Sequence, residues 1–292
     1  MNEEASYIRP GLPRPRIALA VVLLIATILT TTAAGAAYRG VDVFANPYDM
    51  VKGITFSFSL LLVLGTHELA HFIASRRHGV YTTLPLFIPG PPIYPMIGTF
   101  GAVIRIKSPI TTRSALVDIG VSGPLCGFVM AFFVLAYGLT LSTVVPYAPT
   151  GEALAFGAPL LYKMLANLII GTVPEGHEVL LHPAAFAGWI GMFVTAMNLL
   201  PMGQLDGGHV VYALIGRRHR AFSIAVALSL VVIGYFTWPG WYLWAGLTSL
   251  LGLRHPPVMD EDVPLDGKRR VMAAVALAVF VLTFMPTPFY IV

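Results

Sequence analysis

Residues 64–79 read LGTHELAHFIASRRHG and lie at the end of a long apolar run. His67, Glu68 and His71 interrupt that run shortly before the cationic segment SRRH. Ionisable groups are costly in hydrocarbon, and those that occur inside a membrane span usually serve a function. The stretch therefore predicts a membrane-spanning helix that carries a polar site near one of its ends.

The composition of the whole chain is that of a membrane protein. Its 292 residues are 57% hydrophobic and 11% charged, whereas soluble domains carry about 25% charged residues. The net charge of +4 is small, and the cations cluster beside apolar runs. We therefore expect the lipid bilayer, and not nucleic acid, as a partner. Cys126 is the single cysteine, which excludes an intrachain disulfide and a cysteine metal cluster.

The apolar runs predict an all-α polytopic membrane protein with six or seven transmembrane helices and a short membrane-associated β-hairpin. No signal-peptide cleavage pattern accompanies the first run, so we expect that run to stay as an anchor. Residues 1–292 would form a single integral-membrane domain. Its expected parts are an N-terminal span at 17–37, a core at about 50–215 and C-terminal spans at about 221–291. The expected spans are 17–37, 50–74, 115–145, 184–200, 221–238, a shorter one at 241–253, and 271–291.

The third apolar run, at 115–145, is longer than one crossing requires. It contains Gly123 and Pro124, and proline removes a helix hydrogen bond. We therefore expect this run to tilt in the bilayer or to break near these two residues.

The positions of the cations predict the orientation in the membrane. If the spans alternate with the amino terminus inside, every cluster falls on one side, and the opposite loops carry only Arg39, Lys52 and Lys163. Positive charge is enriched on the cytoplasmic side. We therefore expect a multi-pass protein of the cell membrane with a cytoplasmic N-terminus and a cytoplasmic active-site side. The clustered cations are Arg9, Arg14, Arg16, Arg76, Arg77, Arg105, Lys107, Arg113, Arg217, Arg218, Arg220, Arg254, Lys268, Arg269 and Arg270.

Two segments outside the spans carry their own signals. Residues 81–98 are rich in Pro and Gly, and GTFGAVIRIKS at 98–108 predicts a strand or hairpin. This part is either a plain cytoplasmic loop or a strand edge that pairs with an extended peptide. Residues 146–182 predict an interfacial helix on the outer side. The side chains there that could bind a metal, although exposed loop residues rarely do so, are Glu175, His177, Glu178 and His182.

The spacing of His67 and His71 is that of a metal-binding pair. Residues four apart lie on one face of a helix, and Glu68 is offset by about 100° from His67 and about 60° from His71. Glu68 would then flank a bound metal and act as the base for its water. Zinc with three protein ligands and a water suits this arrangement. The alternative is a set of satisfied polar side chains between helices, which a bilayer disfavours.

The third metal ligand must come from another part of the chain. No glutamate occurs between Glu68 and Glu152, which rules out a nearby glutamate ligand on a following helix. Ala74 and Arg77 stand where the extended motif of one soluble metalloprotease branch requires Gly and His. Both soluble patterns therefore fail.

Asp206 and Asp118 remain as the carboxylates in or near spans, apart from a charged loop at 259–266. Asp206 lies in the stretch NLLPMGQLDGGH and returns to the same side of the membrane as the two histidines. Gly207 and Gly208 beside it permit close backbone approach. We expect Asp206 to be the ligand, with a helix N-cap as its other role, and Asp118 is the competitor.

Asn198 stands at the end of the fourth apolar run. Pro201 cannot donate a backbone hydrogen bond, so the helix should end there and leave polar groups that need partners. The Asn198 amide would then either bind a substrate backbone or an oxyanion, or make a structural hydrogen bond at the helix end.

With these motifs the sequence resembles the site-2 protease family of intramembrane zinc metalloproteases. THELAH at 66–71, GPLCGF at 123–128 and NLLPMGQLDGG at 198–208 carry the resemblance. Two further segments, at 98–108 and 182–191, are similar to the plastid and cyanobacterial branch named for ethylene-dependent gravitropism deficiency.

The resemblance implies one zinc ion per chain, bound by His67, His71 and Asp206. It also implies that Glu68 activates water and that Asn198 helps to hold the substrate. The implied reaction is cleavage of a peptide bond within or next to a transmembrane segment of a membrane protein, as in regulated intramembrane proteolysis. Some relatives carry a PDZ or CBS module, for which this chain has no room, so substrate selection would rest on the hairpin and the membrane.

Two other classes of function use the same residues. A metal-ion or proton transporter would spread its His and carboxylate groups across the membrane depth, whereas here they crowd near one face. A non-proteolytic membrane binding protein could retain the zinc site without cleaving anything. The sequence predicts neither the substrate nor the oligomeric state.

Overall fold

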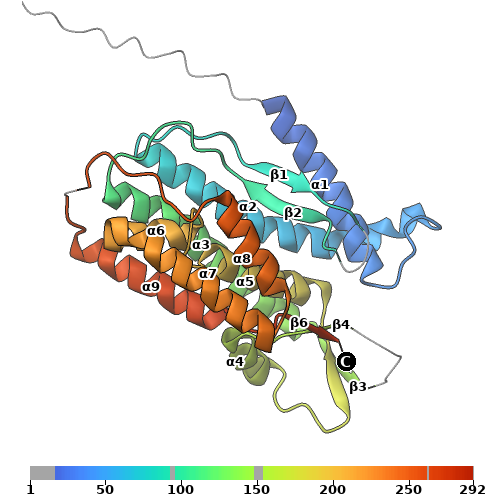
Figure 1. Cartoon of the computed structure of the whole chain (residues 1–292). Helices are drawn as coiled ribbons and strands as arrows, with labels where there is room; N and C mark the ends of the chain where they lie inside the picture. The colour runs from blue at the N-terminus through green and yellow to red at the C-terminus, as the bar shows by residue number, and fades with distance from the viewer. Residues whose placement is uncertain (1–16, 93–95, 148–153, 262, 292) are drawn as a thin grey trace, which may run out of the picture.

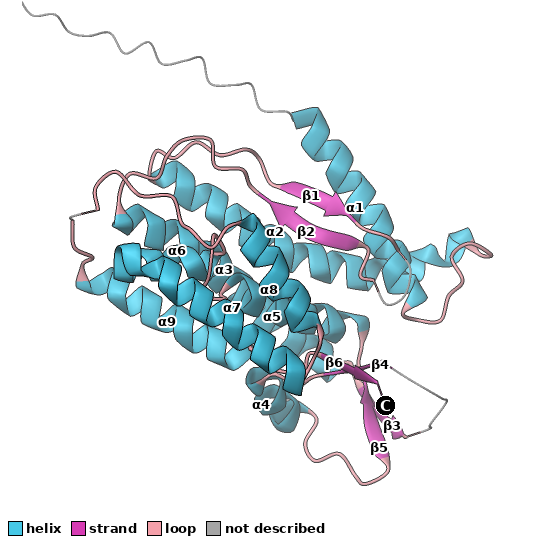
Figure 2. Ribbon diagram, in the orientation of Figure 1, coloured by secondary structure: helices cyan, strands magenta, loops and turns pink. Residues whose placement is uncertain are grey.

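The computed structural model describes residues 17–92, 96–147, 154–261 and 263–291, so the cations Arg9, Arg14 and Arg16 lie outside the described residues. Helices dominate the described part (Figures 1 and 2). They are α1 (Ile17–Ala37), η1 (Pro47–Gly53), α2 (Ile54–Arg77), α3 (Arg113–Thr140), α4 (Leu160–Ile169), α5 (Pro183–Asn198), α6 (Asp206–Ile215), η2 (Gly216–Arg218), α7 (His219–Phe236), α8 (Gly240–Leu251) and α9 (Gly267–Thr283).

In the described residues, four helical segments are long and apolar enough to cross a membrane, and two of them join successive helices. Six or seven spans were expected, and that number is not found in the described residues. The helices α5, α8 and α9 have 16, 12 and 17 residues, whereas a crossing takes about 20. Pro201 and Pro239 limit α5, α7 and α8 where the sequence predicts, whereas α9 ends at Thr283, before Pro286, and so falls short of the expected span at 271–291. The four segments are 17–37, 47–77, 113–140 and 206–236.

Helix α3 corrects the expectation for the third apolar run. It remains continuous through Pro124 and ends at Thr140, so there is no break at Gly123 and Pro124. The rest of the expected span belongs to a strand that starts at Thr143. Because α3 is unbroken, this one helix packs against both α2 and α6.

The strands form three antiparallel pairs in the described part of the chain. In the pair β1–β2, Leu86 stands opposite Val103 and Pro89 opposite Thr99, with an irregularity between them, which confirms the hairpin expected near 98–108. The other two pairs, β3–β5 and β4–β6, lie together at one end of the molecule (Figure 2). The strands are β1 (Leu86–Pro89), β2 (Thr99–Val103), β3 (Thr143–Pro146), β4 (Leu154–Phe156), β5 (His177–Leu180) and β6 (Phe289–Ile291).

The core forms where α2, α3 and α5 pack against one another, with α6 and α9 against α3. Small residues allow close helix packing in membranes. A Cβ atom added at Gly138 of α3 would overlap the backbone of Ala185 in α5, and one added at Gly188 of α5 would overlap Leu135 in α3. The indole of Trp189 is 1% exposed next to these contacts. The central helices are therefore held at a short, fixed separation.

The hairpin β1–β2 lies against α1 and α2 (Figure 1). Thr30 of α1 donates a hydrogen bond of 2.6 Å to the carbonyl of Gly98, just before β2. Within the described residues, β2 pairs with β1 along one edge only, and its other edge has no strand partner. An unpaired strand edge can accept an extended peptide.

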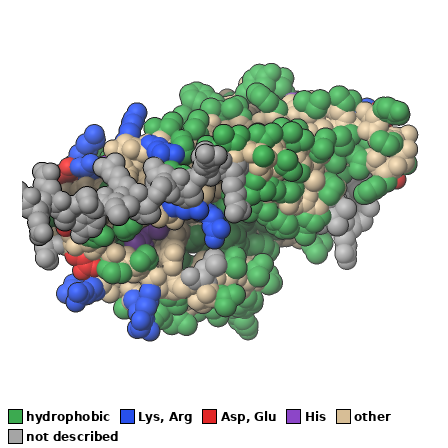
Figure 3. Space-filling view, turned by 90° about the horizontal axis from the view of Figure 1, so that it is seen from above, with side chains coloured by type: hydrophobic (Ala, Val, Ile, Leu, Met, Phe, Trp, Pro, Cys, Tyr) green, Lys and Arg blue, Asp and Glu red, His purple; other side chains and the backbone are tan. Residues whose placement is uncertain are grey.

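Cationic side chains gather at one end of the molecule, and much of the remaining visible surface is hydrophobic (Figure 3). Arg76 and Arg77 end α2, Arg113 begins α3, and Lys268 lies in the first turn of α9. These helix ends therefore meet at one face, as the charge pattern of the sequence predicts.

Candidate metal centre

Two elements far apart in the sequence bring three donor atoms together. His67 and His71 stand one turn apart on α2, with their Nε2 atoms 3.1 Å from each other. Asp206 begins α6, and its Oδ2 lies 3.4 Å from His67 Nε2 and 3.2 Å from His71 Nε2. All three side chains are at least four-fifths buried. In the described residues this is the group whose geometry could hold a metal ion.

The spacing of these donors fits zinc. Two donors bound to one zinc ion at about 2.0–2.1 Å with tetrahedral angles lie about 3.3–3.4 Å apart. The observed separations of 3.1, 3.2 and 3.4 Å are close to that value. Two imidazole nitrogens and one carboxylate oxygen are also a donor set of catalytic zinc sites, which leave one position open.

A second hydrogen bond fixes the ring of His71. Its Nδ1 donates to the carbonyl of Ile119 in α3 over 2.8 Å, because a carbonyl oxygen can only accept. The neutral ring then carries its lone pair on Nε2, the atom that faces His67 and Asp206. A hydrogen bond to the far nitrogen of a metal-binding histidine typically fixes ring and tautomer in this way.

Glycines of α3 form the wall behind the two imidazoles. A Cβ at Gly123 would overlap three atoms of the His71 ring, and one at Gly127 would lie 3.0 Å from His67 Nδ1. Gly120 lies in the same way against α6, where a Cβ would be 3.2 Å from the Asp206 carbonyl. The GPLCGF motif therefore clears space for the histidines. Gly123 and Gly127 are four residues apart, as are His67 and His71. This equal spacing is a sequence signal for the contact that the sequence analysis does not use.

Glu68 is 8% exposed and lies beside the donor atoms on α2. Ile104, one residue beyond the end of β2, lies near this carboxyl group. The end of the hairpin therefore stands next to the expected base.

The two aspartates take different positions. Leu205 and not Asp206 occupies the N-cap of α6, and no side chain caps that helix, so the cap role of Asp206 is not found. Asp118 lies away from the donors and accepts hydrogen bonds from Arg269 Nε over 3.1 Å and from His78 over 2.9 Å. Asp118 therefore ties α2, α3 and α9 together at the cationic end and does not compete for the metal.

Asn198 lies at the last position of α5, next to the centre. Its Nδ2 donates to His67 Nε2 over 3.3 Å. The structure thus brings the amide to the site, as the sequence predicts from Pro201.

The outer-loop side chains that could in principle bind a metal form no metal-binding group in the described part of the chain, as expected for exposed loop residues. His177 and Glu178 are exposed in β5, and His182 caps α5 by accepting a hydrogen bond from the N–H of Ala184. Glu175 is likewise exposed. Helix α4 is present where the interfacial helix was expected.

A second pair of histidines, which the sequence analysis does not single out, lies close to α6, the helix that begins with Asp206. His209 Nδ1 lies 2.6 Å from His255 Nε2, and His255 Nδ1 lies 2.6 Å from the carbonyl of Pro256. The ring of His255 also stacks on Tyr212. Burial, with the nearby His209, lowers the pKa of His255 to about 3. The pair links α6, which carries Asp206, to the segment after α8.

Comparison with known proteins agrees with this geometry. The model of peptidase family M50 matches residues 55–238. The chain is 28% identical over 248 residues to "Probable zinc metalloprotease EGY2, chloroplastic" of Oryza sativa subsp. indica, covering 84% of this chain and 45% of the relative. It is 32% identical over 243 residues to "Probable zinc metalloprotease EGY1, chloroplastic" of Arabidopsis thaliana, covering 80% and 43%. The chain thus spans less than half the length of these relatives.

Proposed function

The chain belongs to peptidase family M50, and on that premise we propose that it is an intramembrane zinc metalloendopeptidase. Its substrates would be membrane proteins, cleaved within or next to a transmembrane segment. The observation that carries this proposal is the convergence of His67, His71 and Asp206, with donor atoms 3.1–3.4 Å apart, beside Glu68 inside an apolar helix bundle.

His67, His71 and Asp206 would hold one zinc ion per chain. A zinc ion bound there would supply a Lewis acid for a water molecule and for the scissile carbonyl. The hydrogen bond from His71 to the Ile119 carbonyl keeps the Nε2 lone pair available for it. The buried position of all three side chains limits access of bulk water, which strengthens electrostatic interactions at the site.

Glu68 would serve as the general base and acid. It would take the proton of the attacking water and deliver it to the amine that leaves. Glu68 is 8% exposed, so its carboxylate keeps few competing water contacts. The backbone N–H of Ile104, which lies near this carboxyl group, would help to orient it.

Asn198 would bind the substrate. The lone pair of His67 Nε2 cannot both accept the Asn198 hydrogen bond and bind a metal. With metal bound, the Asn198 amide would therefore be free to donate to a substrate carbonyl or to a developing oxyanion.

The free edge of β2 is the proposed path for the substrate backbone. A transmembrane helix hides its carbonyl groups in internal hydrogen bonds, so it must unwind before hydrolysis. Pairing with β2 would replace those hydrogen bonds and would bring the peptide close to Glu68, because Ile104 lies near that carboxyl group.

The orientation is part of the proposal. The cationic ends of α2, α3 and α9 lie on one face, and positive charge favours the cytoplasmic side. His71 is five residues from Arg76, or about 8 Å of helix rise. The site would therefore lie a short distance into the bilayer from the cytoplasm.

Two variants test the function. Glu68→Gln should retain zinc and lose cleavage, and Asp206→Ala should lose much of its zinc. Metal analysis of the purified variants measures their zinc content. Comparative proteomics of membrane fractions from cells with wild-type protein or Glu68→Gln should reveal transmembrane fragments that disappear in the variant.

Other outcomes would favour the alternative functions. Unchanged zinc in Asp206→Ala would refute the ligand assignment. Metal flux into proteoliposomes that contain the protein would point to a transporter. Zinc binding together with identical fragment patterns in the two cell types would point to a binding protein without protease activity.

A further inference from the structure

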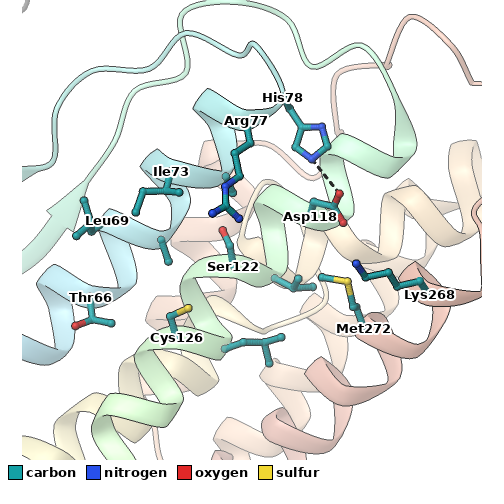
Figure 4. A pocket seen from close by; sticks show the side chains of 14 residues that line it. Thr66, Leu69, Ile73, Arg77, His78, Asp118, Ser122, Cys126, Lys268 and Met272 are labelled. Carbon is teal, nitrogen blue, oxygen red and sulfur yellow. Dashed lines mark hydrogen bonds and ion pairs between the residues drawn. The ribbon is translucent and has the colours of Figure 1, made fainter.

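A groove opens between α2, α3 and α9 on the side of α2 away from the hairpin. Its volume is about 590 Å³, within the range of about 300–1,000 Å³ that is usual for small-molecule sites. Figure 4 shows α2 and α3 crossing along the groove and α9 closing it. None of the three proposed zinc ligands lines this groove.

The end of the groove at the helix termini is cationic. Arg77 of α2 and Lys268 of α9 both line it (Figure 4). Among the described residues, no ion pair engages Arg77 or Lys268. Asp118 also lines this end, but His78 and Arg269 already pair with it. Neither Arg77 nor Lys268 therefore has a salt-bridge partner among the described residues, and Lys268 interacts with Asp266 only at longer range.

The other part of the groove is apolar and lies deeper along the same helices. Leu69 and Ile73 of α2, Leu125 of α3 and Met272 of α9 line it. Leu69 is 50% exposed and Ile73 is 42% exposed, although both belong to a segment long and apolar enough to cross a membrane. Leu69 is eight residues from Arg77, so the apolar part extends about 12 Å from the cations along α2.

We propose that this groove binds an anionic phospholipid. Arg77 and Lys268 would contact the phosphate and a negatively charged headgroup, and one acyl chain would lie along Leu69, Ile73 and Met272. Guanidinium groups bind phosphate through paired hydrogen bonds, and basic pockets between transmembrane helices at the cytoplasmic side suit anionic lipid headgroups. The cationic end lies at the last turn of α2, where Arg76 and Arg77 stand and where lipid headgroups would be expected.

The shape and charge of the groove favour a lipid over two other occupants. A helix about 10–12 Å in diameter would place only about one turn in this volume, whereas an acyl chain is narrow enough to follow it. A free phosphate ion would use the cations but would leave the apolar part exposed. A lipid with one charged and one apolar end uses both.

Cys126 provides a reporter for the groove. It is the only cysteine of the chain, it is exposed, and it lines the apolar part. The experiment measures the rate at which N-ethylmaleimide modifies Cys126 in the purified full chain in dodecyl maltoside. Added phosphatidylglycerol should slow the modification by about tenfold at a concentration about ten times its Kd, as mass action requires.

Matched variants connect the protection to the two cations. Arg77→Gln and Lys268→Gln should each raise the phosphatidylglycerol concentration needed for protection by about tenfold, the effect of one charged hydrogen bond. Arg270→Gln, on the same helix but outside the groove, should leave it unchanged. Equal modification rates without lipid in all variants show that the fold around Cys126 is intact.

Four results would overturn the proposal. They are equal protection by phosphatidylcholine, protection by inorganic phosphate alone, protection by a polyleucine transmembrane peptide but not by lipid, and no protection by any addition. The assay needs neither bound zinc nor cleavage. Its outcome is therefore independent of the proposed protease function.

Discussion

The imidazole of His71 lies directly against the backbone of Gly123, with no room for a Cβ atom between them. Four residues earlier in α2 and four residues later in α3, His67 stands against Gly127 in the same way, with slightly more space. Two glycines of α3 and two histidines of α2 thus form matched pairs across one helix contact. The donor geometry depends on this contact as much as on the ligands themselves.

Replacement of Gly123 by alanine should therefore weaken metal binding. The added methyl group would displace the His71 ring, and loss of such supporting contacts typically lowers metal affinity by about 10–100-fold. Competition with a zinc chelator on purified protein measures the change. Gly127→Ala should have a smaller effect, because its Cβ would stand 3.0 Å from His67 Nδ1.

Gly246→Ala is the control for this pair, since nothing lies within 4 Å of its added Cβ. It should retain wild-type zinc affinity. If Gly123→Ala behaved like Gly246→Ala, the packing of α3 against the histidines would not govern the site.

Asn198→Ala should separate cleavage from metal binding. We expect wild-type zinc content, because Asn198 is not among the three donors, and a fall in cleavage rate of about 10²–10³-fold, as for loss of an oxyanion donor. The exposed Asn167 provides the control substitution Asn167→Ala. A loss of zinc in Asn198→Ala would instead make the amide a structural support of His67.

Asp118→Asn should lower stability without affecting zinc. The carboxylate accepts hydrogen bonds from Arg269 and His78, and bonds of this charged kind contribute about 1.5–3 kcal/mol each. Thermal unfolding in detergent measures the loss. Asp49→Asn removes an exposed ion pair with Lys52 and should cost at most about 1 kcal/mol. Reduced zinc in Asp118→Asn would return this aspartate to the list of ligands.

Acidification should destabilise the protein partly through His255. Burial lowers the pKa of His255 to about 3, so below about pH 6.5 the unfolded chain binds a proton that the folded chain does not. Stability must then fall as the pH decreases through 6.5 towards 3. The melting temperature should drop between about pH 7.5 and about pH 5, and it should drop less in His255→Gln. His177→Gln, at an exposed position, should keep the full wild-type drop.

Much of the architecture follows from local sequence patterns. The expected span at 17–37 coincides with α1 (Ile17–Ala37), and α2 and α7 lie within a few residues of their apolar runs. The hairpin near 98–108 follows from its glycines and β-branched residues. The number of spans did not follow, because the apolar runs at 184–200 and 241–253 form helices of only 16 and 12 residues, whereas a crossing takes about 20. Helix α9 ends at Thr283, before the end of the expected span at 271–291.

For the metal site, too, some features follow from the local sequence and others only from the tertiary structure. His67, Glu68 and His71 are defined by their own spacing, since residues one and four apart on a helix have known relative directions. That Asp206 meets them, 135 residues after His71, and that Asp118 pairs with Arg269, 151 residues away, depended on how the helices pack. Helix periodicity specifies which residues share a face, whereas the contact between two faces is chosen by shape complementarity, here by the glycines of α3.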